Sequence, residues 1–400
     1  LNDSKATRWG ALVIVAFTMM AAYYVNDVVA PLKTMLETDL AWSSTDFGFF
    51  TGGYSFLNVF FLMLIWGGLI LDRFGIRFTG KLATILMVGG TALEYYAMTG
   101  LAGADATLFG INEIFGYKTG VFVAFAGYSI FGVGAEVAGI TVSKIIAKWF
   151  KGKELATAMG VQVALARIGS QAGYAVAIPL ARAFGISTPV LLGLVLLLGG
   201  MIAFFIFAVM DKKLDKQMEA AAIAAGTEDE EEKFSFKDVK NILVNPGFWL
   251  IALLCVLFYS CVFPFQKFAS ELMIIKYGIN ENVAGTFAGL PALGALILTP
   301  VFGGFIDKRG KSASIMLLGS AMLICVHFIY AIPDINYWLV AIVLMIILGI
   351  AFSLVPSAMW PAVAKIFPVS QLGTAYALIF FIQNIGLWGI PTLIGWVLDA

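Results

Sequence analysis

Two charged residues, Arg167 and Glu136, stand inside segments that are apolar enough to lie in lipid. Arg167 follows "ATAMGVQVALA" (156–166), and Glu136 lies in "FGVGAEVAGITVSK" (131–144). An unpaired charge at the bilayer centre costs at least about 2.5–3.5 kcal/mol, so such residues usually pair with each other or face a cavity. A guanidinium binds a carboxylate through two parallel hydrogen bonds, and a carboxylate can bind an ammonium group. The two residues therefore predict either a salt bridge between helices or a site for a small charged solute.

The composition of the chain places both charges in a membrane protein. Of its 400 residues 60% are hydrophobic and only 12% are charged, whereas a soluble domain carries about 25% charged residues. The 25 basic and 25 acidic residues balance, which argues against nucleic-acid binding. The three cysteines lie in apolar runs and are expected to pack as small hydrophobic residues. The sequence thus predicts an all-α polytopic membrane protein.

Apolar segments of about 20 residues, the length that crosses a bilayer, recur along the whole chain. We expect eleven spanning helices, at 10–30, 45–71, 79–100, 119–146, 155–183, 189–210, 247–275, 283–306, 313–332, 337–360 and 371–398. Eleven is an odd number, the chain begins at a leucine, and it stops just after a span. We therefore expect that both ends are trimmed and that a twelfth helix is absent.

Most Lys and Arg residues fall in loops on the side of the N-terminus, which the positive-inside rule assigns to the cytoplasm. One long polar stretch, with "GTEDEEEK" at its centre, separates two apolar parts. We predict an N-terminal six-helix bundle (1–210), a cytoplasmic linker (211–246) and a C-terminal bundle (247–400). Predicted outer loops contain no N-x-[ST] glycosylation site, which favours a bacterial inner membrane over a glycosylated organelle protein.

An internal repeat relates the two parts. "GGLILDRFGIR" (67–77) recurs as "GGFIDKRGK" (303–311), and "FKGKELATA" (150–158) as "FPVSQLGTA" (367–375). The first motif resembles the signature of the major facilitator superfamily, a resemblance that covers the chain apart from the absent last helix. It implies two six-helix halves that alternate access to a central site. It also implies a cytoplasmic latch that closes when the transporter opens outward, with the residues Asp72, Arg73, Arg77, Asp307, Lys308 and Lys311.

Longer strings indicate a narrower group. "WFKGKEL", "ARIGS", "VFPF", "MWPAVA", "QLGTAYA" and "IQN" occur in order across both halves. They resemble the group of lysosomal dipeptide transporters called major facilitator superfamily domain-containing protein 1, which has bacterial relatives. The resemblance implies transport of dipeptides or similar zwitterions, with Arg167 and Glu136 in the central site. We expect Arg167 to receive a substrate carboxylate, and Glu136 either to balance it or to bind an ammonium.

The repeat places uncharged groups opposite this pair. Aligning the second motif pair sets Asn384 against Arg167 and Ser353 against Glu136. We expect an asymmetric cavity, with its charge on the N-terminal half and hydrogen-bonding or aromatic groups on the other. The remaining candidates for substrate binding are Tyr259, Phe263, Trp360, Gln383, Tyr54 and Asn58.

Three further polar residues have alternative interpretations. Glu94, near the outer end of a span, is expected mainly at the membrane interface, with gating as the alternative. Lys267 either reaches the cavity or extends to the outer surface. A single histidine, His327, argues against a histidine-rich metal site.

No motif for catalysis, ATP hydrolysis or cofactor binding is present, so we expect a transporter driven by gradients rather than an enzyme. Facilitated diffusion is favoured, because a carboxylate tied to Arg167 would carry protons poorly. The alternative is a proton-coupled symporter of organic anions such as sugar acids, and a more remote one is a membrane receptor or scaffold that transports nothing. The expected partners are a small solute and the lipid bilayer, without nucleic acid, and the expected state is a monomer.

Overall fold

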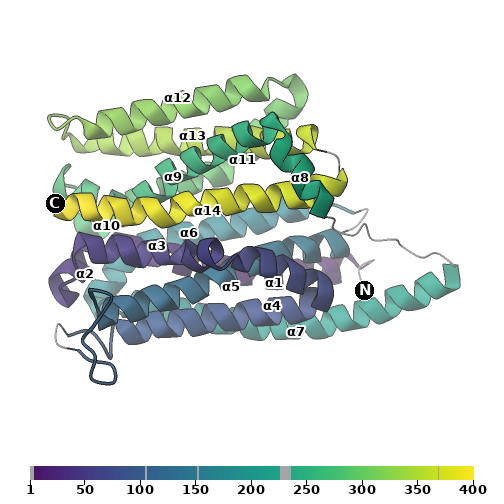
Figure 1. Cartoon of the computed structure of the whole chain (residues 1–400), viewed down its shortest axis with the longest axis horizontal. Coiled ribbons are helices and arrows are strands. Elements are labelled where there is room, and N and C mark those ends of the chain that lie inside the picture. Colours follow the sequence, from purple (N-terminus) through teal and green to yellow (C-terminus); the bar gives the residue numbers. More distant parts are fainter. Residues whose placement is uncertain (1–3, 104–105, 151–152, 226–235, 368) are drawn as a thin grey trace.

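Long helices lie alongside one another in two bundles (Figure 1). The computed structural model describes residues 4–103, 106–150, 153–225, 236–367 and 369–400. The first part contains α1 (Lys5–Val28), the 3₁₀ turn η1 (Ala30–Leu32), α2 (Lys33–Leu40), α3 (Ser44–Phe60), α4 (Met63–Ala97), α5 (Thr119–Trp149), α6 (Leu155–Phe184) and α7 (Thr188–Ala225). The second contains α8 (Phe236–Val244), α9 (Pro246–Ile275), α10 (Glu281–Ala288), α11 (Leu290–Arg309), α12 (Ser312–Ala331), α13 (Trp338–Ile366) and α14 (Val369–Asp399).

Capping residues explain where several helices begin and end. Ser4 accepts a hydrogen bond from the first turn of α1, and Ser43 forms a capping box with Asp46 at the start of α3. Asn245 caps α9 just before Pro246, whose ring suits the first helical position. A two-stranded hairpin, β1 (Glu113–Ile114) with β2 (Tyr117–Lys118), lies between α4 and α5.

The predicted spans agree with helices, except around the second and third and at the eighth (283–306), which is divided between α10 and α11 at Gly289. The span expected at 45–71 is broken after Phe60, because Leu62 adopts a left-handed conformation (φ 53°), and α3 and α4 meet at a bend of 58°. The loop expected before residue 79 is helical on both sides of Gly75, whose φ of 75° and ψ of 173° lie outside the helical region. α4 thus consists of two helical parts joined at a glycine. By length and composition, eight described helices can cross a membrane, or nine if the bent pair is one span.

The predicted linker is partly helical. α7 continues to Ala225, and α8 occupies most of the described residues between 236 and the start of α9. The acidic run at 226–233 lies outside the described residues.

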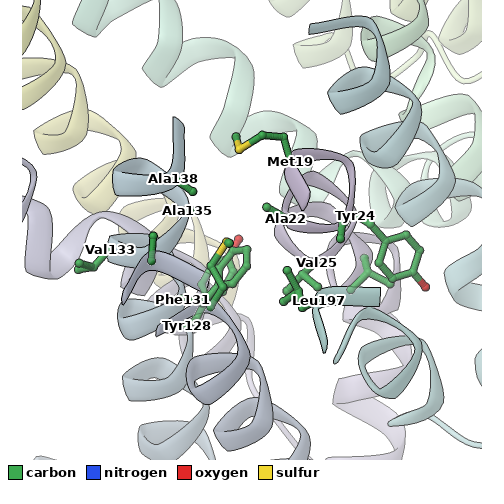
Figure 2. Packing of buried hydrophobic residues seen from close by; sticks show 14 of the residues in the cluster. Met19, Ala22, Tyr24, Val25, Tyr128, Phe131, Val133, Ala135, Ala138 and Leu197 are labelled. Carbon is green, nitrogen blue, oxygen red and sulfur yellow. The ribbon is translucent and has the colours of Figure 1, made fainter. Parts of the chain in front are cut away.

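Each bundle has its own apolar core. In the first bundle Tyr128 and Phe131 of α5 stack with ring centroids 5.8 Å apart, close to Val25 of α1 and Leu197 of α7 (Figure 2). A second core is built mainly from helices of the second bundle, α9 to α14, and Tyr174 of α6 packs into it. The two cores agree with the two halves that the internal repeat predicts.

The two halves touch mainly along two seams, α3 with α14 and α6 with α10 and α11. Backbones are very close at the first seam, since a methyl group on Gly48 would lie 2.4 Å from the carbonyl oxygen of Pro391. We call the end of the molecule with the N-terminus and α8 the N-terminal face, and the end with α2 and the C-terminus the opposite face (Figure 1).

Candidate functional site

A cavity of about 1050 Å³ lies between the two halves. It extends from residues near the N-terminal face, among them Asp72, Ser143 and Thr374, to Lys267 on the side of the opposite face. Its size suits a small organic solute. The structure therefore presents an enclosed path that opens toward the N-terminal face.

The opposite end of the cavity is closed by ion pairs between the halves. Lys267 of α9 donates to Asp27 of α1 at 3.1 Å and to the hydroxyl of Tyr128 at 3.3 Å. Nearer the surface, Lys33 is 1% exposed and bonds to Glu271 of α9 at 2.5 Å. The alternative that Lys267 extends to the outer surface is thus wrong, because its ammonium is buried in a pair that joins the halves.

Arg167 lines this cavity from α6. Its guanidinium carbon lies 5.5 Å from the ring centroid of Tyr23 and 5.2 Å from that of Phe352, which belongs to the second half. Among the residues that the structure describes, no carboxylate lies within ion-pair distance of this guanidinium. Aromatic faces stabilise the cation without occupying its N–H donors, which leaves them directed at what enters the cavity.

Glu136 lines the same cavity from α5. Its Oε1 accepts a hydrogen bond of 3.0 Å from the hydroxyl of Tyr54 on α3. The salt bridge with Arg167 that the sequence suggested is not formed, and both charges act electrostatically on Tyr23. The cavity therefore carries a separate positive and negative group, an arrangement that matches a zwitterion.

The second half supplies an aromatic wall, as expected. Trp360 Nε1 donates to the hydroxyl of Tyr259 at 3.2 Å, and the rings of Tyr259 and Phe263 stack at 5.5 Å. Gln383 also lines the cavity, and its Oε1 accepts a weak hydrogen bond from the Cys255 thiol. These side chains form an apolar surface with a few hydrogen-bonding groups.

The two predicted asparagines do not line the cavity. Asn384 is buried, and its amide nitrogen donates to the Phe380 carbonyl at 2.9 Å. Asn58 is buried too, and neither amide atom has a partner in the described part of the chain. Ser353, the repeat counterpart of Glu136, bonds to the Gly349 carbonyl within α13. The repeat relates helices faithfully but not the directions in which all their side chains point.

The expected latch residues of the first half make contacts within that half. Lys144 pairs with Asp72 at 3.0 Å, Arg77 pairs with Asp215 of α7 at 2.9 Å, and Arg73 lies over the Phe74 ring. In the second half Lys308 and Lys311 are exposed, and the side chain of Asp307 lies outside the described residues. An Asp72 that is engaged inside its own half accords with a cavity open at the N-terminal face.

The predicted position of Glu94 was wrong. It was expected at the membrane interface, but it is 0% exposed, behind the closed end of the cavity. Sequence reasoning counted Asp27 only among the weaker candidates for the site and not as a partner of Lys267, and it did not single out Tyr128. The signal was present only as polar residues near the ends of two predicted spans.

Comparison with known proteins agrees with this architecture. The family model of the Major Facilitator Superfamily matches residues 12–389, and the chain belongs to that family of membrane transporters. The chain is thus a multi-pass integral membrane protein and a transporter rather than an enzyme.

Similar proteins narrow the group. The chain is 29% identical to the human lysosomal dipeptide transporter MFSD1 over 99% of this chain and 81% of that protein. It is 28% identical to the mouse MFSD1 over 99% of this chain and 81% of that one. The solved structure of the nucleoside transporter NupG superposes with a TM-score of 0.70 at 13% identity, covering 97% of this chain and 91% of that one. A bacterial homologue of the human lysosomal transporter Spinster gives 0.68 at 15% identity, covering 98% and 82%.

Proposed function

We propose that this transporter carries dipeptides, or zwitterions of similar size. We keep facilitated diffusion as the proposed mode, with proton coupling as the alternative that the uptake assay below decides, because Glu136 bonds to Tyr54 and not to Arg167. The observation that carries the proposal is the position of Arg167, which faces the cavity without an acidic partner among the described residues. Its planar fork suits a substrate carboxylate. Glu136 on the same cavity supplies a negative charge for an ammonium group. The names of the MFSD1 relatives support the same class of solute.

We propose alternating access as the mechanism. The ion pairs at the opposite face hold the halves together there, and the separated latch residues leave the N-terminal face open. Rocking of the halves would break the first set and bring the Asp72 and Asp307 loops together. The aromatic wall of the second half then closes on a solute held by the first half.

Orientation and location follow from charge. We propose that the N-terminal face is cytoplasmic, because most Lys and Arg residues lie at that end. A bacterial inner membrane remains our proposal for the compartment. We also propose that the chain works as a monomer, because one chain lines the whole cavity.

A thermal-shift screen of the purified protein tests the substrate. Dipeptides should raise the melting temperature of the wild type, and Arg167→Ala should abolish the shift. Arg309→Ala is the matched control, since Arg309 is an exposed arginine at the end of α11 and should leave the shift unchanged. Stabilisation by sugar acids alone would instead support the proton-coupled anion symporter.

A reconstituted system separates transport from binding. Uptake of a radiolabelled dipeptide into proteoliposomes should be lost in Arg167→Ala and should occur without proton movement. A dipeptide that binds but never crosses the bilayer would contradict a transport function for that solute.

A further inference from the structure

Glu94 is a buried carboxyl group that the proposed transport mechanism does not use. It lies one helical turn after Gly90, on the face of α4 that packs against α5. A methyl group on Gly90 would lie 2.4 Å from the Gly127 carbonyl oxygen, so the two backbones are in contact. The side chain of Glu94 is consequently 0% exposed, and neither carboxyl oxygen has a hydrogen-bond partner in the described residues.

Two ionisable groups of other helices lie near Glu94, and a third is bonded to one of them. Lys267 of α9 and Tyr128 of α5 lie within its electrostatic reach, and Asp27 of α1 bonds to the same lysine. The facing part of α7, residues 188–210, contains no ionisable side chain. Glu94 therefore lies directly behind the group of residues that closes the opposite end of the cavity.

The two carboxyl groups at this end have contrasting surroundings. Asp27 accepts hydrogen bonds from Asn26 at 2.9 Å, from Lys267 at 3.1 Å and from the hydroxyl of Ser170. Asp27 thus has three hydrogen-bond donors, one of them charged. Glu94 has no such donors, and an ionised carboxylate without them is costly in an apolar interior.

We propose that Glu94 is a proton-binding site that is occupied while the opposite face is closed. When the halves separate there, Lys267 leaves with the second half and water reaches the space that it and Tyr128 cover. A hydrated Glu94 then loses its proton more readily. Proton binding is thereby linked to closure, so a lower pH on the opposite side favours the conformation described here.

The position of Glu94 also determines from which side the proton comes. Glu94 is absent from the lining of the cavity and has no exposed surface in this state. Lys267 and Tyr128 line the cavity, so these two side chains separate Glu94 from it, and a proton enters and leaves when the halves part at the opposite face. Such a site regulates transport by pH without moving protons across the membrane, and this conclusion does not depend on which solute is carried.

Infrared spectroscopy tests the protonation state directly. At neutral pH the wild type should show the carbonyl band of a protonated carboxylic acid, and Glu94→Gln should lack it. The matched control is Glu113→Gln, which removes an exposed carboxyl group of β1 and should leave the band in place. A spectrum that is identical in wild type and Glu94→Gln would overturn the proposal.

Spin labels, one on each half at the opposite face, test whether protonation of Glu94 is linked to closure of that face. Acidification should shift the wild type and Glu113→Gln toward the closed distance, whereas Glu94→Gln should stay closed at every pH. If Glu94→Gln does not give a monodisperse protein, Glu94→Asp replaces it, because this variant keeps an ionisable group. The midpoint pH of the change in label distance must then differ from that of the wild type, whereas the midpoint for Glu113→Asp must not. An unmoved midpoint would contradict the assignment.

Vesicles in which the pH is changed at only one face of the protein test from which side the proton reaches Glu94. Acid at the opposite face should shift the label distances, and acid at the N-terminal face should not. A response to acid at the N-terminal face would overturn the one-sided access of this proton.

Discussion

The guanidinium of Arg167 lies 5.2 Å from the ring centroid of Phe352, a residue of the other half of the transporter. Arg167 belongs to α6 and Phe352 to α13. Phe352 packs against Tyr259 and Phe263, so this contact joins the proposed carboxylate site to the aromatic wall. A cation–π contact is worth about 0.5–1 kcal/mol at an exposed site and about 2 kcal/mol or more when desolvated. The contact links the guanidinium of the first half directly to the second half.

Phe352→Leu removes the aromatic face and keeps most of the apolar volume. We expect the affinity for a dipeptide to fall about 2- to 30-fold, the range that corresponds to the loss of one cation–π contact. The control is Phe258→Leu, because Phe258 stacks on Phe352 at 6.1 Å without being an aromatic partner of Arg167. Isothermal titration calorimetry measures the dipeptide affinity of both variants. An equal loss of affinity in the two would show that the effect does not come from the contact with Arg167.

Tyr54→Phe removes the hydroxyl that donates to Glu136 at 3.0 Å. A hydrogen bond to a charged group contributes about 1.5–3 kcal/mol, so we expect binding of free-amine dipeptides to weaken by about tenfold or more. N-acetylated dipeptides, which lack the ammonium, should be affected less. A double-mutant cycle with Glu136→Gln checks the reason, since strictly additive effects would show that Tyr54 does not act through Glu136.

The two halves and the cavity positions of Arg167 and Glu136 could be predicted from the sequence, because both depend on where residues lie along the helices. A charge in the middle of an apolar span must face a cavity or a partner, and Arg167 and Glu136 both line the cavity. Which partner each would find depends on the rotation and tilt of whole helices. Glu136 therefore accepts a hydrogen bond from Tyr54 and does not pair with Arg167, although both charges were expected at similar depth.

The same limit explains the misplaced residues. Asn384 and Asn58 lie on the correct helices but point into helix contacts, a difference that a shared repeat does not encode. Glu94 became buried because Gly90 and Gly127 allow α4 and α5 to touch. That contact joins two glycines that are far apart in the sequence, and neither glycine by itself predicts it.

Lys33→Met should open the opposite face. Lys33 bonds to Glu37, to Glu271 at 2.5 Å and to Ser44 at 2.8 Å, and its loss leaves two carboxylates without their cation. Removal of one partner from a buried pair costs about 3–5 kcal/mol, and here that cost falls on the closed state. Distances between spin labels on the two halves should therefore lengthen at this face.

Lys276→Met is the control for that experiment. Lys276 donates only to the carbonyls of Tyr330 and Ile332 within the second half, as far as the described contacts extend. Its loss should lower stability without changing the distance between halves. Unchanged distances in Lys33→Met would mean that other contacts keep the face closed.

Glu154→Gln should lower stability at neutral pH by an amount that disappears in acid. The hydrogen bond from Arg8 to Glu154, 2.6 Å long, holds the pKa of this carboxyl below its usual range. A depressed pKa in the folded state contributes stability above the usual carboxyl range, and that contribution is lost as the pH falls through the folded value. Melting curves of wild type and variant should converge at acid pH, and a constant difference would contradict this account.

Gly169→Ala should weaken both stability and substrate binding. A methyl group there would lie 2.1 Å from the Met20 carbonyl oxygen, so α6 must move away from α1. Overpacking of this kind costs about 1–3 kcal/mol, and the movement carries Arg167, two residues earlier, away from Tyr23. Gly160→Ala is the matched change on the same helix, because nothing lies within 4 Å of its added methyl. That variant should gain about 0.5–1 kcal/mol and bind normally. Urea unfolding and dipeptide titration compare the two, and equal behaviour would show that the close approach of α6 and α1 does not position Arg167.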